Sequence, residues 1–446
     1  MSVRVRFAPS PTGFLHVGNV RIAILNYLFA KKNNGAFILR IDDTDPTRST
    51  KECENMILKD LKWLKIQWDE FYKQSDRFEK YSSAINRLKS SERIYVCYET
   101  KEELSIKKKI QASKGKPPVY DRASLALTKK QIEKFESNGI KPYWRFRLNN
   151  EECAEWNDLV HGKISIPLGS ISDPIVIKPD GSFVYTFASV VDDVDLNISH
   201  IIRGDDHITN TAVQIDLFKA LNGSFPDFAH VPLLSSLDGH DVSKRSGSPL
   251  SIVNMRKDGI EPNAILNILA TLGTSNNAIY NGTINDLIEK FSFEKMSLSS
   301  PKFDIENAKS FSQKILSEKT FEEVKNQLQK LNISNVSEDF WNTIKGNLRS
   351  IKESVFWHDV LCNKISIVKE NESFVNQMLK TLPNPVDFDG WISDLKKVSG
   401  KKGRDLFHPI RTVLTGLEYG PELKKIIGFL GYNSIKSRIE NNLKAS

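Results

Sequence analysis

The first forty residues constrain the fold most, because they read as strand, helix and strand in immediate succession. "VRVRF" (3–7) alternates polar and apolar side chains, as a half-buried strand does. Residues 17–32 have helical spacing and are apolar nearly all round, which predicts a buried helix. "AFILRI" (36–41) is a continuous apolar run, typical of a strand covered on both faces. Two strands joined by one helix predict a parallel βαβ unit.

The rest of the chain extends this pattern and interrupts it once. Helical spacing continues to about residue 89, and "SHIIRGDDH" (199–207) begins a second strand and helix. Residues 90–188 differ, because a basic loop is followed by short runs typical of strands: "PYWRFRL", "KISIP", "PIVIK" and "FVYTF", with a hairpin turn at "KPDGS". After about residue 300 strand signals fade and amphipathic helices dominate.

These segments predict an α/β fold with three parts. The first is a Rossmann-like domain with a parallel sheet, made of residues 1–89 and 189–300. An α+β insertion over residues 90–188 splits it, and an all-α C-terminal region over residues 301–446 follows.

The net charge and the cysteine content limit the partners, metal sites and cellular compartment that the sequence predicts. Lys and Arg number 63 against 55 Asp and Glu, a formal charge of +8 that favours a polyanionic partner, although a solvated basic surface would give the same total. The four cysteines are scattered without a CxxC pair, which argues against disulfides and a structural zinc site and favours a reducing cytoplasm. No secretory signal and no membrane-spanning run are found, so we expect a cytoplasmic protein without a membrane partner.

The segment "APSPTGFLHVGN" lies between the first strand and its helix, where parallel α/β sheets bind ligands. Pro9 and Pro11 fix the backbone, and Gly13 allows a sharp bend. His16 falls at the helix start, where free N–H groups favour an anion, and Gly18 leaves room for a flat ring or a phosphate. The segment predicts a nucleotide site, with a merely capping histidine as the alternative. Neither GxxxxGK[ST] nor an early GxGxxG occurs.

Two further features carry charge. "LDGHDVSKRSGSPLS" (237–251) is a polar loop whose adjacent cations, Lys244 and Arg245, suit charge stabilisation in a transition state, although an isolated SKR is more often a solvated turn. Charged side chains also follow two predicted strands, in "RIDDTD" and "RGDDH". Together with Arg6 they would fit a zwitterionic ligand that has a second acid group. Ordinary surface acids are the alternative for any one of them.

Several ordered motifs together resemble the class I aminoacyl-tRNA synthetases, and more narrowly the bacterial glutamyl-tRNA synthetase family. The resemblance covers residues 6–416, so it spans essentially the whole chain. The segments that carry it are "RFAPSPTGFLHVGNVRIAILNYLFA", "FILRIDDTD", "VVDDVDLNISHIIRGDDHITNTAVQ", "HVPLL", "SKRSG", "DGIEPNAILNILATLG" and "GRDLFHPIRTVLTG".

The resemblance implies roles for individual residues, with ATP between residues 9–19 and 241–245. It implies that Arg6 and Arg203 face the two glutamate carboxylates and that Asp42 faces the ammonium, which suits the planar fork of arginine. The implied catalytic residues are His16, Lys244 and Arg245. The implied ATP-binding residues are Pro9, Ser10, His16, Gly18, Asn19, Ser243 and Lys244. The implied glutamate-binding residues are Arg6, Ala8, Ser10, Asp42, Tyr185, Ser189 and Arg203.

The implied reaction has two steps. Glutamate attacks ATP to give glutamyl-adenylate, with Mg²⁺ bridging phosphate oxygens, and the acyl group then passes to the end of tRNA. Residues 1–89 and 189–300 are then the catalytic domain with an extension that contacts the tRNA stem. Residues 90–188 would bind the acceptor end, and residues 301–446 the anticodon. There Trp341, Trp357 and Trp391 could stack on bases, but core packing is favoured. A monomer is expected.

The sequence departs from the family pattern at three places. Asp241 stands where the signature loop has its first lysine, so the charge of this loop is reduced. Tyr98 and Glu99 follow Cys97, and no second cysteine lies near Tyr120, so no zinc is predicted. Ser189 occupies a pocket position where some relatives carry asparagine.

Alternatives remain at this stage. Within the family, the enzyme could also glutamylate tRNA-Gln, and the sequence does not separate the two. Glutaminyl-tRNA synthetase and truncated paralogues that modify a tRNA base fit less well, because of "APSPTG" and the C-terminal region. Outside the family, a small-molecule nucleotidyltransferase could use such a corner, but those proteins are usually much shorter and need no helical RNA-binding half. A catalytically dead RNA-binding protein is a further alternative, and the intact His16, Lys244, Arg6 and Arg203 argue against it.

Overall fold

The computed structural model describes residues 2–115, 117–221, 223–236, 250–278, 282–333, 336–363 and 365–445. The chain forms two compact units. The first comprises Met1–Met255 and Ile265–Ile305, and the second comprises Arg256–Ala264 and Glu306–Ser446. Each is described by itself.

The first unit holds every strand of the described chain. Its strands are β1 (Arg4–Phe7), β2 (Ala36–Ile41), β3 (Glu70–Lys73), β4 (Ile94–Cys97), β5 (Tyr143–Phe146), β6 (Cys153–Asp158), β7 (Gly162–Pro167), β8 (Ile175–Ile177), β9 (His200–Gly204), β10 (Asp227–Val231), β11 (Ser235–Ser236) and β12 (Lys302–Phe303). Its helices are α1 (Val17–Lys32), α2 (Lys51–Trp63), α3 (Phe78–Ser90), α4 (Lys101–Ser113), α5 (Lys129–Ser137), α6 (Tyr185–Asp195), α7 (Ile208–Ala220) and α10 (Ile284–Lys290).

A parallel sheet forms the centre of this unit. β1 pairs with β2 and β2 with β3, all parallel, and β9 pairs in parallel with β10. The two groups meet at β1 and β9, where the Ser199 N–H donates to the Arg4 carbonyl at 2.9 Å and the Arg4 N–H donates to Ser199 Oγ at 2.8 Å. The predicted Rossmann-like α/β fold is thereby confirmed, and β1, α1 and β2 match the predicted segments closely.

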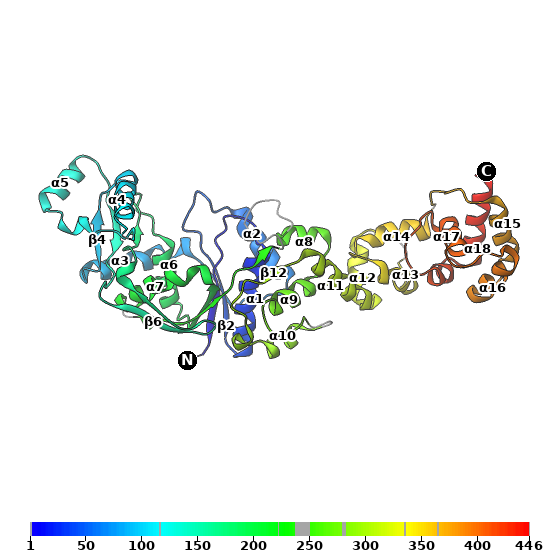
Figure 1. The fold of residues 1–446 in the computed structure, drawn as a ribbon, viewed down its shortest axis with the longest axis horizontal. Helices are drawn as coiled ribbons and strands as arrows, with labels where there is room; N and C mark the ends of the chain where they lie inside the picture. The colour runs from blue at the N-terminus through cyan, green and yellow to red at the C-terminus, as the bar shows by residue number, and fades with distance from the viewer. Residues whose placement is uncertain are drawn as a thin grey trace. The chain divides into compact units, whose positions relative to one another are not determined.

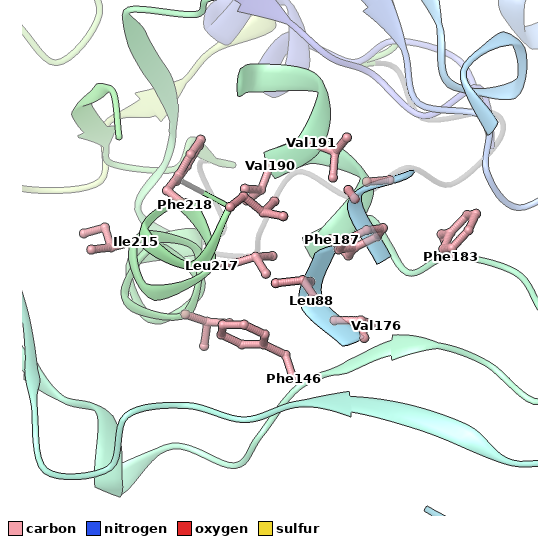
Figure 2. Packing of buried hydrophobic residues seen from close by; sticks show 14 of the residues in the cluster. Leu88, Phe146, Val176, Phe183, Phe187, Val190, Val191, Ile215, Leu217 and Phe218 are labelled. Atoms are coloured by element: carbon pink, nitrogen blue, oxygen red, sulfur yellow. The ribbon is translucent and has the colours of Figure 1, made fainter. Parts of the chain in front are cut away.

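The insertion contributes strands of two kinds. β4, β5 and β8 form an antiparallel sheet, whereas β6 pairs with β7 and also joins β10 in parallel at Asp158 and Phe228. One hydrophobic cluster includes Phe146 and Val176 of the insertion together with Leu88, Phe187 and Leu217 of α3, α6 and α7. Figure 2 shows Phe146 and Val176 beside these helices. The insertion therefore shares its core with the parallel-sheet domain, while α4 and α5 lie at the end of the unit away from α1 (Figure 1).

In the insertion one predicted strand was wrong and one strand was missed. "FVYTF" is not a strand: Phe183 makes one bridge with Ile177, and helix α6 begins at Tyr185. Strand β6 was not predicted, although its residues alternate between exposed and buried. The hairpin turn at "KPDGS" is confirmed, since the Lys178 N–H donates to the Ser182 carbonyl at 2.9 Å and Gly181 has φ 84°.

The second unit is helical throughout its described residues, as predicted. Three helices contribute residues to both units: α8 (Ile252–Asp258), α9 (Pro262–Thr271) and α11 (Ile305–Glu318). The others are α12 (Phe321–Lys330), α13 (Glu338–Ile344), α14 (Glu353–Cys362), α15 (Glu372–Thr381), α16 (Phe388–Ser399), α17 (Arg404–Thr415) and α18 (Leu423–Lys444), which is broken at Gly431. Trp341, Trp357 and Trp391 are buried in one core cluster, so core packing is their role. No described helix is long and apolar enough to cross a membrane.

Candidate active site

The predicted nucleotide corner is a helix start capped by its histidine. His16 is the N-cap residue of α1, and its Nδ1 accepts the Gly18 N–H at 3.2 Å. A Cβ at position 18 would lie 3.0 Å from two atoms of the His16 ring, so glycine also preserves the ring position. Because Nδ1 is an acceptor, a neutral imidazole carries its proton on Nε2 and can donate it to a ligand.

A cavity of about 510 Å³ opens beside this corner, at the carboxyl ends of β1 and β9. Its volume falls in the range of small-molecule sites. Most of the described candidates line it. They are Arg6, Ala8, Pro9, Ser10, His16, Gly18, Asn19, Tyr185 and Arg203. Ile22, Leu233 and Leu234 add an apolar wall.

Arg203 lines this cavity, and one of its guanidinium nitrogens is buried without a hydrogen-bond partner among the described residues. Its side chain is 5 % exposed, its Nε donates to His230 Nε2 at 3.3 Å, and its Nη2 donates to Thr211 Oγ1 at 2.5 Å. Within the described residues, Nη1 has no hydrogen-bond partner. A buried guanidinium with an unsatisfied nitrogen suits an anionic oxygen, because the missing bond costs free energy until a partner supplies it.

A buried charge network lies behind the other arginine of the cavity. Arg6 donates from Nε to Asp193 Oδ1 at 3.1 Å, and Arg40 donates to the same oxygen at 2.7 Å. Arg40 has no exposed surface and also holds Asp42, with its Nε 2.7 Å from Oδ1. Burial alone would raise the pKa of Asp193, but Arg6 and Arg40 together hold it below its ordinary value. Asp193 therefore stays charged and fixes Arg6.

Asp42 lies in an adjoining cavity of about 240 Å³, whose wall also includes Ser10 and Tyr185. The two residues line both cavities, so Asp42 adjoins the Arg6 and Arg203 cavity. Burial raises the pKa of Asp42 to about 6, with the charge of Arg40 opposing it. At neutral pH this carboxylate is ionised and suits an ammonium group.

The remaining candidates lie elsewhere. Ser189 is fully buried on α6, where its Oγ accepts from Gln214 Nε2 at 3.0 Å, and it does not line either cavity. Ser243, Lys244 and Arg245 lie outside the described residues, as does Asp241.

The residues that follow this loop contact the corner directly. The Val17 N–H donates to the Leu250 carbonyl at 3.1 Å, and the Ile252 N–H donates to the Leu15 carbonyl at 2.9 Å. These two bonds hold the described residues after the loop, Leu250 and Ile252, at the start of α1.

Sequence analysis missed the residues that hold these side chains. Arg40, Asp193, Asp158 and His230 received no role, because the contacts that matter join distant positions: Arg203 and His230 are 27 positions apart, Arg40 and Asp193 are 153 apart, and Arg6 and Asp193 are 187 apart. A polar residue inside an apolar strand, such as Arg40 in "FILRI", is the signal that could have marked one of them.

Within the described ranges, no three His, Cys, Asp or Glu side chains lie close enough to hold a metal ion. The buried Cys97 thiol lies 3.7 Å from Tyr120 Oη, which donates to Glu99 Oε1 at 2.7 Å.

Comparisons with known protein families identify the class to which this fold and this site belong. Residues 2–310 match the family of class I tRNA synthetases for E and Q, catalytic domain, and residues 373–443 match an anticodon binding domain. The chain belongs to the class I tRNA synthetases, and within them to the glutamate–tRNA ligase family.

Full-length relatives support the narrower assignment. The chain is 43% identical to glutamate–tRNA ligase 2 of Hyphomonas neptunium and 44% identical to glutamate–tRNA ligase 1 of Bartonella quintana, in each case over 98% of this chain and 99% of the relative. A crystal structure of a glutamate tRNA ligase from Elizabethkingia meningosepticum, in complex with its amino acid, superposes with a TM-score of 0.86 at 26% identity, covering 100% of this chain and 99% of that one.

Proposed function

We propose that the protein is a glutamate–tRNA ligase that activates L-glutamate with ATP and transfers it to tRNA-Glu. The observation that carries the proposal is the 510 Å³ cavity, in which a capped helix start faces two buried arginines, one of which has an unsatisfied nitrogen. The relatives named above, which are similar over nearly the whole chain, support the same activity.

The two ends of the cavity suit the two small substrates. The apolar wall of Ile22, Leu233 and Leu234 suits adenine, and the start of α1 suits phosphate oxygens. Arg6 and Arg203 then take the two carboxylates of glutamate, and Asp42 takes the α-ammonium. Glutamine would leave one of these cationic groups without its charged partner, which disfavours it.

Activation then needs positioning and charge stabilisation but no covalent nucleophile. The glutamate α-carboxylate attacks the α-phosphorus of ATP, forming a C(O)–O–P bond, and pyrophosphate leaves. His16 donates from Nε2 to phosphate oxygens, and the N–H groups of α1 add further donors. Lys244 and Arg245 supply cationic charge from the loop whose far end is bonded to α1 at Leu250.

Mg²⁺ would arrive with ATP and be held chiefly by phosphate oxygens and water. The donor set of the site fits this, because the one carboxylate among the residues that line the main cavity, Asp206, is exposed, and the described residues offer no cage of their own.

Transfer to tRNA uses the rest of the chain. The 3′-terminal ribose hydroxyl attacks the glutamyl carbonyl, and AMP leaves. We assign the acceptor end to residues 90–188, the stem to the extension before residue 300, and the anticodon to residues 301–446. The formal charge of +8 favours such a polyanion. We further propose that the protein acts as a monomer in the cytosol.

An aminoacylation assay tests the proposal. The protein is incubated with ATP, Mg²⁺ and labelled glutamate, with purified tRNA-Glu, purified tRNA-Gln or neither. Acylation of tRNA-Glu alone is expected. Acylation of both tRNAs would show the relaxed form of the enzyme. Acylation of neither tRNA would contradict the proposal and favour a protein that does not acylate tRNA, such as a small-molecule nucleotidyltransferase.

A further inference from the structure

Asp158 and His230 form a buried pair behind the cavity that the reaction above does not use. His230 lies on β10 with no exposed surface, and its Nδ1 is 2.6 Å from Asp158 Oδ2. Asp158 is the last residue of β6, which belongs to the insertion. Its carboxylate also accepts the backbone N–H groups of Val160, His161 and His230 at 3.0 to 3.1 Å. This number of donors keeps it ionised, and the pKa of Asp158 is lowered because these bonds outweigh the effect of burial.

The pair fixes which nitrogen of His230 can accept a hydrogen bond. A carboxylate facing Nδ1 requires the proton on that atom, so Nε2 carries the lone pair. Nε2 lies 3.3 Å from the donating Nε of Arg203 and 2.8 Å from Thr211 Oγ1. Burial lowers the pKa of His230, with Asp158 opposing, so the ring is neutral at pH 7 and does not repel Arg203.

Two of the three guanidinium nitrogens of Arg203 are held by side chains of β10 and α7. His230 takes its Nε, and Thr211 takes its Nη2, while Nη1 has no partner within the described residues. Rotation about the last side-chain bonds of Arg203 would break both contacts, so the pair determines where Nη1 points.

We propose that Asp158 and His230 are positioning residues that orient Arg203 for the glutamate carboxylate, so that the insertion supplies part of the amino-acid site. The proposal rests on the carboxylate-binding role of Arg203 given above. It assigns β6 a function besides any contact with tRNA.

The test compares two substitutions at one position. His230→Phe keeps an aromatic ring against Phe228 and Trp156 but removes the acceptor, whereas His230→Gln places an amide oxygen near the position of Nε2. Aminoacylation is measured once with glutamate varied at saturating ATP and tRNA, and once with ATP varied at saturating glutamate and tRNA. We expect His230→Phe to raise KM for glutamate by about tenfold to a hundredfold, the range for a lost hydrogen bond to a charged group. KM for ATP should change less than about twofold, and His230→Gln should recover most of the loss.

His200 offers a matched control. It lies on the neighbouring strand β9, and its Nε2 is 3.5 Å from Asp227, but it does not line the cavity. His200→Phe should leave KM for glutamate unchanged. If His230→Phe does not fold, Asp158→Asn decides, with the same expected rise in KM for glutamate.

Two results would overturn the proposal. One is a folded His230→Phe or Asp158→Asn with the wild-type KM for glutamate. The other is an equal loss for ATP and glutamate that His230→Gln does not recover. Arg203→Gln, measured in parallel, tests the carboxylate-binding role of Arg203 separately from the positioning role of Asp158 and His230. If Arg203→Gln keeps the wild-type KM for glutamate, Arg203 does not bind the carboxylate, and the proposed function of this residue fails as well.

Discussion

The two units of the chain differ in the charged side chains that they bury. The first unit buries a set of arginines, aspartates and one histidine, including Arg6, Arg40, Asp193, Arg203 and His230. In the second unit, Glu261 is the one buried charged side chain among the described residues, and its partner is Lys319 at 2.5 Å. The second core is otherwise apolar or weakly polar.

The ligands proposed for the two units, a small amino acid and a large polyanion, account for this difference. A small charged amino acid must be enclosed to be recognised, so the groups that meet it are buried and need buried partners. A large polyanion is met at the surface, where charge needs no buried support. Substitutions in the two units should therefore have different consequences.

Arg40→Met should have the largest effect. It leaves Asp42 and Asp193 buried without their shared cation, and breaking a buried ion pair in this way costs about 3–5 kcal/mol. Denaturant unfolding monitored by circular dichroism measures the loss. A change below about 1 kcal/mol would show that the network contributes little to this unit.

Trp391→Ala should destabilise the second unit by about 3–5 kcal/mol, because it empties a fully buried site. It should not change the affinity for ATP or for a glutamyl-adenylate analogue, measured by calorimetry, since the first unit supplies every proposed contact with them. If the first unit remains folded and the analogue nevertheless binds more weakly, the second unit contributes to binding of the small ligands, contrary to this comparison.

Lys244→Ala should slow glutamate activation by about 10² to 10³, the effect of losing one group that stabilises transition-state charge. Rapid-quench measurement of adenylate formation gives the rate, and filter binding gives tRNA affinity, which should stay nearly unchanged. A large loss of tRNA binding would move Lys244 from the small-ligand site to the polyanion surface.

Asp42 predicts a pH dependence of smaller size. Its pKa of about 6 means that the carboxylate is ionised above that pH and neutral below it. kcat/KM for glutamate should therefore fall about tenfold per pH unit below pH 6, since it reports the free enzyme. The pKa of His207, lowered to about 4 by burial and then by Arg203, lies outside this window. A flat profile down to pH 5 would contradict the role of Asp42, and Asp42→Asn should remove the dependence.

The smallest effect is expected at the surface of the second unit. Lys402 is exposed and Lys401 is half-buried, in the loop after α16. If each contacts phosphate, replacing both by alanine should lower the slope of log affinity for tRNA against log salt by about 2. Stability should change by less than about 0.5 kcal/mol. An unchanged slope would exclude this loop from the tRNA surface.

The sequence predicted the local elements of the first unit well where hydrophobic periodicity was strong. β1, α1 and β2 are nearly continuous apolar segments with clear ends. "FVYTF" misled because its residues favour strands, whereas packing against α3 and α7 makes it the start of α6. β6 was missed because its inward positions include Trp156 and Asp158, and an inward aspartate does not fit an apolar alternation.

The site was predictable only in part for a related reason. Arg6, Asp42 and Arg203 could be found because residues at strand ends meet at one edge of a parallel sheet. Arg40 with Asp193 and Arg203 with His230 could not, because only the folded chain brings such distant positions into contact. The groups proposed to bind could be found by pattern, whereas the groups that hold them in place could be found only in the structure.

The most direct test of the account is a crystal structure with a non-hydrolysable analogue of glutamyl-adenylate. The account predicts the phosphate mimic at the start of α1 beside His16, a carboxylate oxygen on Arg203 Nη1, and Lys244 closed over the same ligand. An analogue bound outside this cavity, or Lys244 turned away from an occupied one, would contradict it.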